Sequence, residues 1–209
     1  MKLAAGLGNP GPRYAASRHN IGYAVVDELA RRWTVDLSRY DRHFEGLIGE
    51  AAVGGERVLL LKPATFMNLS GRSVAAVWRF YKLAPADVLV VFDDLDLPVG
   101  QLRIRAAGSA GGHKGMSDVI LQLGTDEIPR VRIGIGKVHR DATVDYVLSA
   151  FEPDEKPRMA EVVGCAAAAV ECWLARGITA AMNQFNPKRN AETSGPPPPD
   201  DRPSEGESS

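Results

Sequence analysis

Four polar side chains stand where loops meet the ends of predicted strands or the starts of predicted helices. Asn9 follows the first apolar run of the chain, and Asp93 follows the run VLVVF. His19 stands at the entry to the first predicted helix, and Asn68 precedes the second within the segment TFMNLSG. Binding sites of open α/β sheets gather at the carboxyl ends of strands, so these four side chains are expected to converge.

Together these side chains offer the chemistry of ester hydrolysis without a covalent intermediate. A histidine changes its protonation state near neutral pH, so His19 can take a proton from water. A carboxylate at Asp93 can hold the other ring nitrogen and stabilise the imidazolium that forms. The amides of Asn9 and Asn68 can orient water or a carbonyl group without adding charge. A purely structural interpretation stays open for three of them, with Asn68 as a helix cap, Asp93 as a turn residue and Asn9 in an Asx-turn.

Two short motifs suggest other enzymes but lack the surroundings that those enzymes need. The segment GLGNPG at residues 6–11 matches the dinucleotide fingerprint, yet Pro10 and Pro12 remove backbone donors that a pyrophosphate would use. The segment at residues 107–111 resembles a nucleophile elbow around Ser109, but it begins with alanine and follows no predicted buried strand. The sequence therefore disfavours both a nicotinamide enzyme and a serine hydrolase.

Neither the histidines nor the cysteines are spaced like metal ligands. No zinc-type spacing joins the four histidines, which are His19, His43, His113 and His139. Cys165 and Cys172 lie in a predicted helix at a separation of about 10 Å, too far for a disulfide. We expect both cysteines to be small core residues, and we expect no metal or cofactor.

The elements that must position these residues alternate between strands and helices. The sequence predicts strands at residues 2–8, 45–53, 57–61, 87–92, 101–105 and 131–136. It predicts helices at residues 21–33, 70–83, 116–123, 156–176 and 178–185, with Asn20 capping the first and Gly177 ending the fourth. This order predicts an α/β fold: a single domain with three layers, α/β/α, around a mixed, mostly parallel central sheet.

Length, charge and hydropathy limit how the chain can be organised. Its 209 residues suffice for one domain with a sizeable core. Residues 191–209 form an acidic, Pro/Ser-rich tail with few apolar side chains, so we expect disorder there and a catalytic domain at residues 1–190. The whole chain has 25 basic and 26 acidic residues. One base and five acids lie in the tail, so residues 1–190 have 24 bases and 21 acids. This small positive net charge permits a local phosphate-binding patch. No run of eighteen apolar residues and no signal-peptide core occurs, so a cytoplasmic protein without a membrane segment is expected.

Several long segments, in one order, resemble the bacterial peptidyl-tRNA hydrolase family. The segments are GLGNPG, Tyr14 with Arg18-His19-Asn20, KPATFMNLSG, FDDLDLP, GSAGGHKG and RVRIGIG, and the resemblance runs from Lys2 to about Asn186. It implies a carboxylic ester hydrolase that cleaves the ester between a peptide and the 3′ ribose of tRNA, and so recycles tRNA from stalled translation. It also implies a single-domain enzyme without metal or cofactor, and we expect a monomer.

The resemblance assigns roles to individual residues. It makes His19 the catalytic base and Asp93 its partner, while Asn9 and Asn68 bind the peptide end. The residues implied to line the cleft or contact substrate are Tyr14, Phe66, His113 and Lys114. The residues implied to contact tRNA are Arg103, Arg105 and Arg132, with Lys137 as a weaker candidate.

One position departs from the family pattern. Lys114 stands where the family usually has an asparagine that engages the substrate, so an amide is replaced by a cation. We expect retained activity with altered substrate affinity or pH profile. The alternative function is a non-catalytic RNA-binding protein of the same fold, like relatives that serve in organelle RNA splicing.

Overall fold

The computed structural model describes residues 1–137 and 143–187, and these residues form one seven-stranded sheet with helices on both faces. The strand order is β2-β3-β4-β1-β5-β7-β6. The four central strands, β4, β1, β5 and β7, are parallel, and the outer strands run antiparallel to their neighbours. The strands are β1 Lys2–Gly6, β2 Tyr40–Asp41, β3 Gly46–Val53, β4 Glu56–Pro63, β5 Val88–Asp94, β6 Leu102–Arg105 and β7 Arg130–Gly134.

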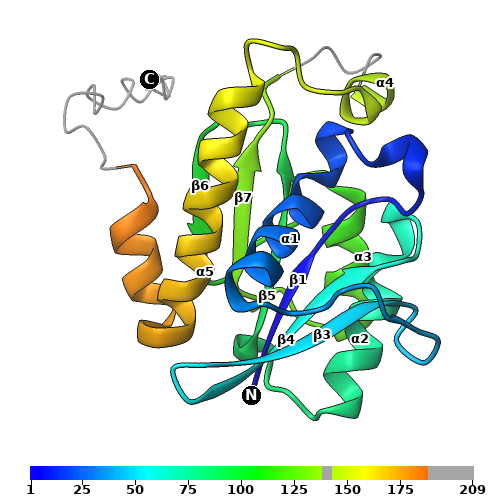
Figure 1. Cartoon of the computed structure of the whole chain (residues 1–209), viewed down its shortest axis with the longest axis vertical. Coiled ribbons are helices and arrows are strands. Elements are labelled where there is room, and N and C mark those ends of the chain that lie inside the picture. The colour runs from blue at the N-terminus through cyan, green and yellow to red at the C-terminus, as the bar shows by residue number, and fades with distance from the viewer. Residues whose placement is uncertain (138–142, 188–209) are drawn as a thin grey trace, which may run out of the picture.

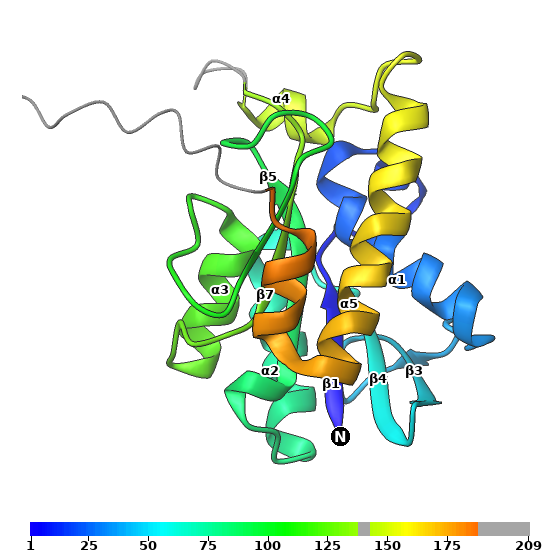
Figure 2. The ribbon, with the colours of Figure 1, turned by 90° about the vertical axis from the view of Figure 1, so that its left-hand side faces the viewer.

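Helices cover the sheet in two separate layers, as Figures 1 and 2 show. On one face α1 (Ile21–Trp33) and α5 (Lys156–Phe185) close a core around Trp173. On the other face α2 (Ser70–Phe80) and α3 (Lys114–Leu123) close a second core around Phe92. The predicted three-layer α/β/α fold with a mixed central sheet is confirmed.

The helix behind the candidate site lies unusually close to the sheet. A Cβ added at Gly6 on β1 would lie 2.1 Å from the carbonyl oxygen of Gly22 in α1. One added at Gly22 would lie 2.4 Å from the carbonyl oxygen of Val91 in β5. Because no side chain separates these backbones, the turn that enters α1 lies directly beside the carboxyl ends of β1 and β5.

Most predicted elements are confirmed, with shifted ends. The helix at residues 21–33 is confirmed at both bounds, and Gly177 (φ 83°) interrupts α5 where the sequence predicted a break. Lys114 begins α3 two residues earlier than predicted, and Asp93 lies inside β5 instead of following it. Among the described β-strands and α-helices, β2 and α4 (Thr143–Leu148) were not predicted.

Two expectations about single residues are wrong. Asn20 occupies the N-cap position of α1, but its side chain makes no cap hydrogen bond because it binds the backbone of Asn9 instead. Cys172 is buried in the core as expected, whereas Cys165 is exposed. Both thiols are free.

One described helix, α5, is long and apolar enough to cross a membrane by length and composition alone. Its chain is interrupted at Gly177, and its buried residues, among them Trp173, pack in the core against α1 and the sheet. We interpret α5 as a core helix. The predicted tail at residues 191–209 lies outside the described residues.

Candidate active site

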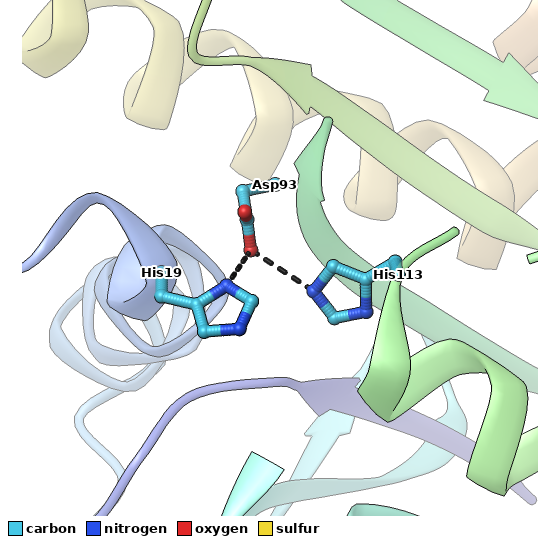
Figure 3. Close-up of side chains that lie close together, drawn as sticks. All are labelled: His19, Asp93 and His113. Carbon is cyan, nitrogen blue, oxygen red and sulfur yellow. Dashed lines mark hydrogen bonds and ion pairs between the residues drawn. The ribbon is translucent and has the colours of Figure 1, made fainter. Parts of the chain in front are cut away.

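His19 and Asp93 meet at the carboxyl edge of the sheet, as Figure 3 shows. Nδ1 of His19 lies 2.7 Å from Oδ1 of Asp93, a hydrogen-bond distance. The Asp93 side chain is 2% exposed and the His19 side chain 12%. Nε2 of His19 has no hydrogen-bond partner among the described residues and is not among their fully enclosed polar atoms. The predicted dyad is therefore assembled, with one ring nitrogen held and the other free to meet a water molecule.

A second histidine binds the same carboxylate oxygen from the opposite side (Figure 3). Nε2 of His113 lies 3.0 Å from Oδ1 of Asp93. Nδ1 of His113 accepts a hydrogen bond from the backbone N–H of Met116, at 3.1 Å, and so caps α3. Since Nδ1 must be unprotonated to accept, the proton of the neutral ring stands on Nε2 and points at Asp93. The structure thus places His113 behind the carboxylate, as its second donor.

The electrostatics of the site keep Asp93 ionised. Complete burial raises the pKa of Asp93, but the electrostatic interaction with His113 and the hydrogen bonds from His113 and His19 outweigh it, so the pKa lies below its usual value. An ionised Asp93 is only an acceptor, so Nδ1 of neutral His19 must carry the proton. Nε2 of His19 is then the unprotonated nitrogen, which is the form that a general base needs.

The turn that carries His19 is short and is fixed by its neighbours. It is a three-residue 3-10 helix, η2 (Arg18–Asn20), a structure with little stability of its own. Oδ1 of Asn20 accepts from the backbone N–H of Asn9 at 2.8 Å, and its Nδ2 donates to the Asn9 carbonyl at 2.9 Å. Asn20 is 5% exposed. It therefore braces the His19 turn against the loop that carries Asn9.

Asn9 extends this brace to the loop of Asn68. Oδ1 of Asn9 accepts from the backbone N–H of Met67 at 2.8 Å, while its Nδ2 makes no hydrogen bond to a described residue. Asn68 follows Met67 within η3 (Met67–Leu69); its side chain is exposed and hydrogen-bonds to no described residue. Neither asparagine acts as a helix cap, so one free donor at Asn9 and one free amide at Asn68 are available to a ligand.

The other predicted contact residues lie on the loops around the dyad. Phe66 is 58% exposed directly before η3. Tyr14 is half-buried on the turn η1 (Pro12–Tyr14) between β1 and His19. Lys114 is exposed at the start of α3, directly after His113. No hydrogen bond joins these three side chains to another described residue.

The predicted tRNA-contacting arginines share one face of the β6–β7 ribbon. Leu102, Ile104, Val131 and Ile133 turn toward α5, so Arg103, Arg105 and Arg132 project from the opposite face. Arg132 forms an ion pair with the buried carboxylate of Asp94. Arg103 and Arg105 are without an ion-pair partner among the described residues, and Lys137 is exposed in the loop after β7. The charges of Arg103, Arg105 and Lys137 are thus not neutralised by a described carboxylate and are available to an anion.

Asp93 and its two histidines are also a set that could hold a metal ion. The three candidate ligand atoms lie within 4.8 Å of one another. However, the Asp93 oxygen lies at hydrogen-bond distance from both ring nitrogens, and Met116 N–H already holds His113 with its proton on Nε2. A metal at that nitrogen would need the proton to move to Nδ1, where it would face the Met116 N–H. The geometry therefore fits a hydrogen-bonded triad better than a metal centre.

A hollow of about 590 Å³ lies away from the triad and lacks this chemistry. It opens beside β3, and among its lining residues are His43, Phe44, Phe80 and Tyr81, but none of the triad. We assign the site by convergent polar groups and not by volume, because within residues 1–137 and 143–187 only the triad combines a held imidazole with a perturbed, buried carboxylate.

Sequence reasoning missed two features of the site. Spacing along the chain gave no reason to join His19 with His113, and the structure brings both to one oxygen. It also assigned Asn20 to a helix cap, although Asn20 braces Asn9. The sequence held one signal for the role of Asn20: it follows His19 directly, and a polar side chain beside a catalytic residue can orient the turn that carries it.

Comparison with known proteins gives a consistent result. The family model described as peptidyl-tRNA hydrolase matches residues 3–193. The peptidyl-tRNA hydrolase of Symbiobacterium thermophilum is 56% identical over 188 residues, which cover 88% of this chain and 98% of that protein. The protein of the same name from Synechococcus sp. (strain JA-3-3Ab) is 53% identical over 190 residues, which cover 90% of this chain and 83% of that protein.

A solved structure agrees in fold. The crystal structure of peptidyl-tRNA hydrolase from Acinetobacter baumannii superposes with a TM-score of 0.84 at 36% sequence identity. The match covers 89% of this chain and 94% of that chain. The similarity in fold therefore extends through most of this chain.

Proposed function

This chain belongs to the peptidyl-tRNA hydrolase family, and from that premise we propose that it hydrolyses the ester between a peptide and the 3′ ribose of tRNA, with His19 as the general base. The observation that carries the proposal is the hydrogen bond from Nδ1 of His19 to buried Asp93, because it leaves Nε2 unprotonated and free. An imidazole held in this way can accept a proton at neutral pH.

In the proposed reaction His19 transfers one proton from the attacking water to the 3′ oxygen of the ribose. Nε2 of His19 takes a proton from a water molecule as the water oxygen attacks the ester carbonyl. Asp93 stabilises the imidazolium that forms, and its second donor, His113, keeps the carboxylate in place. The tetrahedral intermediate then collapses, the bond to the 3′ oxygen breaks, and His19 returns its proton to that oxygen. The products are a peptide carboxylic acid, which releases its remaining proton to the solvent, and a tRNA with a free 3′ hydroxyl group.

The amides beside the dyad suit the peptide end of the substrate. Nδ2 of Asn9 is a free donor on a side chain that is held at its Oδ1, so it can bind a carbonyl oxygen without reorganisation. Asn68 offers a second amide, and exposed Phe66 offers an apolar surface to peptide side chains. Tyr14 and Lys114 are the remaining candidate contacts on the rim of the site.

Arg103 and Arg105 suit the tRNA end. Both are without an ion-pair partner among the described residues, so their charges can be used for phosphate groups. Arg132 is a weaker candidate because Asp94 neutralises it. We also propose a monomeric, cytoplasmic enzyme that works without metal or cofactor. The non-catalytic RNA-binding alternative gains no support from the relatives, which carry the name of the hydrolase.

Incubation with an N-acetylated aminoacyl-tRNA tests the activity. We expect free tRNA to be released, and His19→Ala to lower kcat by about 10²–10⁴-fold, the usual contribution of a general base. The matched control is His43→Ala, which changes an exposed histidine beside β3 and should leave kcat unaltered. Binding of the tRNA without any release by the wild-type protein would refute the proposal.

A further inference from the structure

Arg18, the residue directly before His19, is a buried cation with an elaborate set of contacts. Its side chain is 4% exposed. Nη1 and Nη2 donate to the two carboxylate oxygens of Glu155, at 3.1 and 2.6 Å. The guanidinium also lies over the ring of Tyr146, at 4.4 Å, and over the ring of Phe151, at 4.8 Å. The two hydrogen bonds and the two ring contacts therefore fix the orientation of the Arg18 guanidinium, and Glu155 neutralises its charge.

These contacts tie the His19 turn to a distant part of the chain. Backbone N–H of Arg18 donates to the carbonyl of Ser149 at 2.9 Å, and Ser17 pairs with Ala150 in an isolated bridge. All these partners belong to the segment that starts with α4 and ends at the start of α5, and α4 packs against η2. Figure 1 shows α4 beside the N-terminal loop.

The same segment is anchored to the sheet beside the site. The hydroxyl group of Tyr146 donates to the carbonyl of Ile135, just after β7, at 2.6 Å. Since β7 pairs with β5, which carries Asp93, the Tyr146 ring connects the Asp93 side of the dyad with Arg18 on the His19 side. A continuous set of contacts therefore joins both partners of the dyad through α4.

We propose that Arg18 and Glu155, with the rings of Tyr146 and Phe151, form a clamp that positions His19 for catalysis. The inference rests on the proposed function, because it names positioning residues for the same site. The three residues of η2 have three different anchors: Arg18 binds the clamp, His19 binds Asp93, and Asn20 binds Asn9. A three-residue turn has no internal ladder to hold it, so loss of one flanking anchor lets the imidazole move.

A displacement of this kind affects the chemical step more than binding. Misplacement of a reacting group by about 1 Å can cost as much as about 100-fold in rate. We therefore expect Glu155→Gln and Arg18→Lys each to lower kcat by about tenfold to about 100-fold, while KM changes by less than about threefold. Lysine keeps the charge but not the planar fork or the stacking, so charge alone should not rescue the activity. The double variant should be no slower than the slower single variant, because both changes break one clamp.

The spectroscopic test follows His19 without relying on activity. In protein labelled with ¹⁵N-histidine, the wild-type His19 should show a proton on Nδ1 and none on Nε2 above neutral pH. The His19 signals are assigned by comparison with His19→Ala. In folded Glu155→Gln and Arg18→Lys, we expect a mixture of tautomers or exchange broadening at His19 alone. The control is Glu50→Gln, which breaks an exposed Arg57–Glu50 pair on the β3–β4 hairpin and should leave the spectrum and kcat unchanged.

The outcomes separate the two proposals. If folded clamp variants keep wild-type kcat and the wild-type His19 tautomer, the clamp is only structural and the inference is wrong. The inference is equally wrong if kcat falls only in proportion to the fraction of folded protein. If the wild-type protein does not hydrolyse the ester, the proposed function fails, while the tautomer measurement still decides whether Arg18 positions His19.

Discussion

At the scale of single residues, one oxygen atom organises the site. Oδ1 of Asp93 accepts from both His19 and His113, and Met116 N–H fixes which nitrogen of His113 carries the proton. Burial of this carboxylate would be unfavourable if either donor were lost, since a buried charge needs its hydrogen bonds. The two donors thus make an ionised Asp93 possible in a buried position, and the ionised Asp93 makes His19 a base.

We predict that Asp93→Asn lowers kcat by about 10²–10⁴-fold with little change in KM. The amide oxygen can still accept hydrogen bonds, so the ring remains held, but the negative charge that stabilises the imidazolium is lost. Steady-state kinetics on N-acetyl-aminoacyl-tRNA measure the effect. Asp27→Asn, which removes an exposed partner of Lys62, is the matched control. A variant with more than a tenth of wild-type kcat would show that the Asp93 charge is dispensable.

Lys114 is a residue at which we expect this chain to depart from its family's pattern. It is exposed at the start of α3, directly after His113, and no carboxylate among the described residues neutralises it. We predict that Lys114→Asn raises KM by about twofold to fivefold at low ionic strength, because a cation near the ester can attract the terminal phosphate groups of the tRNA. In about 0.5 M salt the difference should disappear. Identical kinetics and pH profiles at both ionic strengths would mean that this position has no role here.

At the scale of elements, the loops after β1 and β4 are joined by two asparagines. Asn20 holds the backbone of Asn9, and the side chain of Asn9 holds the backbone of Met67. The loops therefore support one another, and none of them depends on a regular ladder of its own. This arrangement explains why Asn20 does not cap α1: its two polar atoms are already used.

Asn20→Ala should consequently affect both stability and catalysis. It leaves a buried N–H and a buried C=O of Asn9 unpaired, which we expect to cost about 1–3 kcal/mol in the free energy of unfolding. Release of the His19 turn should also lower kcat. Asn68→Ala is the informative comparison, since Asn68 is exposed and unpaired among the described residues. That change should alter kinetics with no loss of stability in urea denaturation, whereas equal stability losses would contradict the brace.

The sequence predicts those parts of this fold that have a local signal. Helix α1 is predicted at both ends because apolar positions recur at helical spacing from Ile21 onward, and β5 because its apolar run is uninterrupted. Helix α4 has only six residues, and β2 has two, too few for a periodic pattern. The resemblance implies that His113 contacts substrate, which stays a prediction. Its hydrogen bond to Asp93 was not predicted, because chain spacing does not show that the start of α3 meets the end of β5. Contacts between loops that are distant in sequence form only when the whole sheet is assembled, so no local sequence pattern predicts them.

At the scale of the whole molecule, the site lies where four separate parts of the chain meet. The loop after β1, the end of β5, the start of α3 and the segment from α4 to α5 each contribute a residue that contacts the dyad or its turn. The basic face of β6 and β7 lies one strand away from Asp93, because β7 pairs directly with β5. A nearly neutral chain can therefore still offer cations beside its catalytic edge to a polyanionic substrate.

The link between α5 and the His19 turn should make the stability of the whole domain depend on pH. The hydrogen bond from Arg18 lowers the pKa of Glu155 below its ordinary value in the folded protein. A depressed pKa means that the folded state binds this proton less tightly than the unfolded state, so the stabilisation is complete above the unfolded pKa of about 4.3. It is lost as the pH falls through the folded pKa, because protonated Glu155 no longer pairs with Arg18.

We therefore predict that Glu155→Gln is less stable than the wild-type protein by roughly 2–3 kcal/mol at pH 7, somewhat below the cost of breaking a fully buried pair. This difference should stay constant down to about pH 5 and then decrease as the pH falls through the lowered pKa of folded Glu155, below which both proteins carry a neutral side chain at position 155. Urea denaturation at closely spaced pH values measures the two free energies of unfolding. Glu50→Gln, on an exposed pair, should show a smaller difference that is reduced further by salt. A Glu155→Gln difference that is independent of pH would mean that the contribution of Glu155 to stability comes from packing and not from its charge.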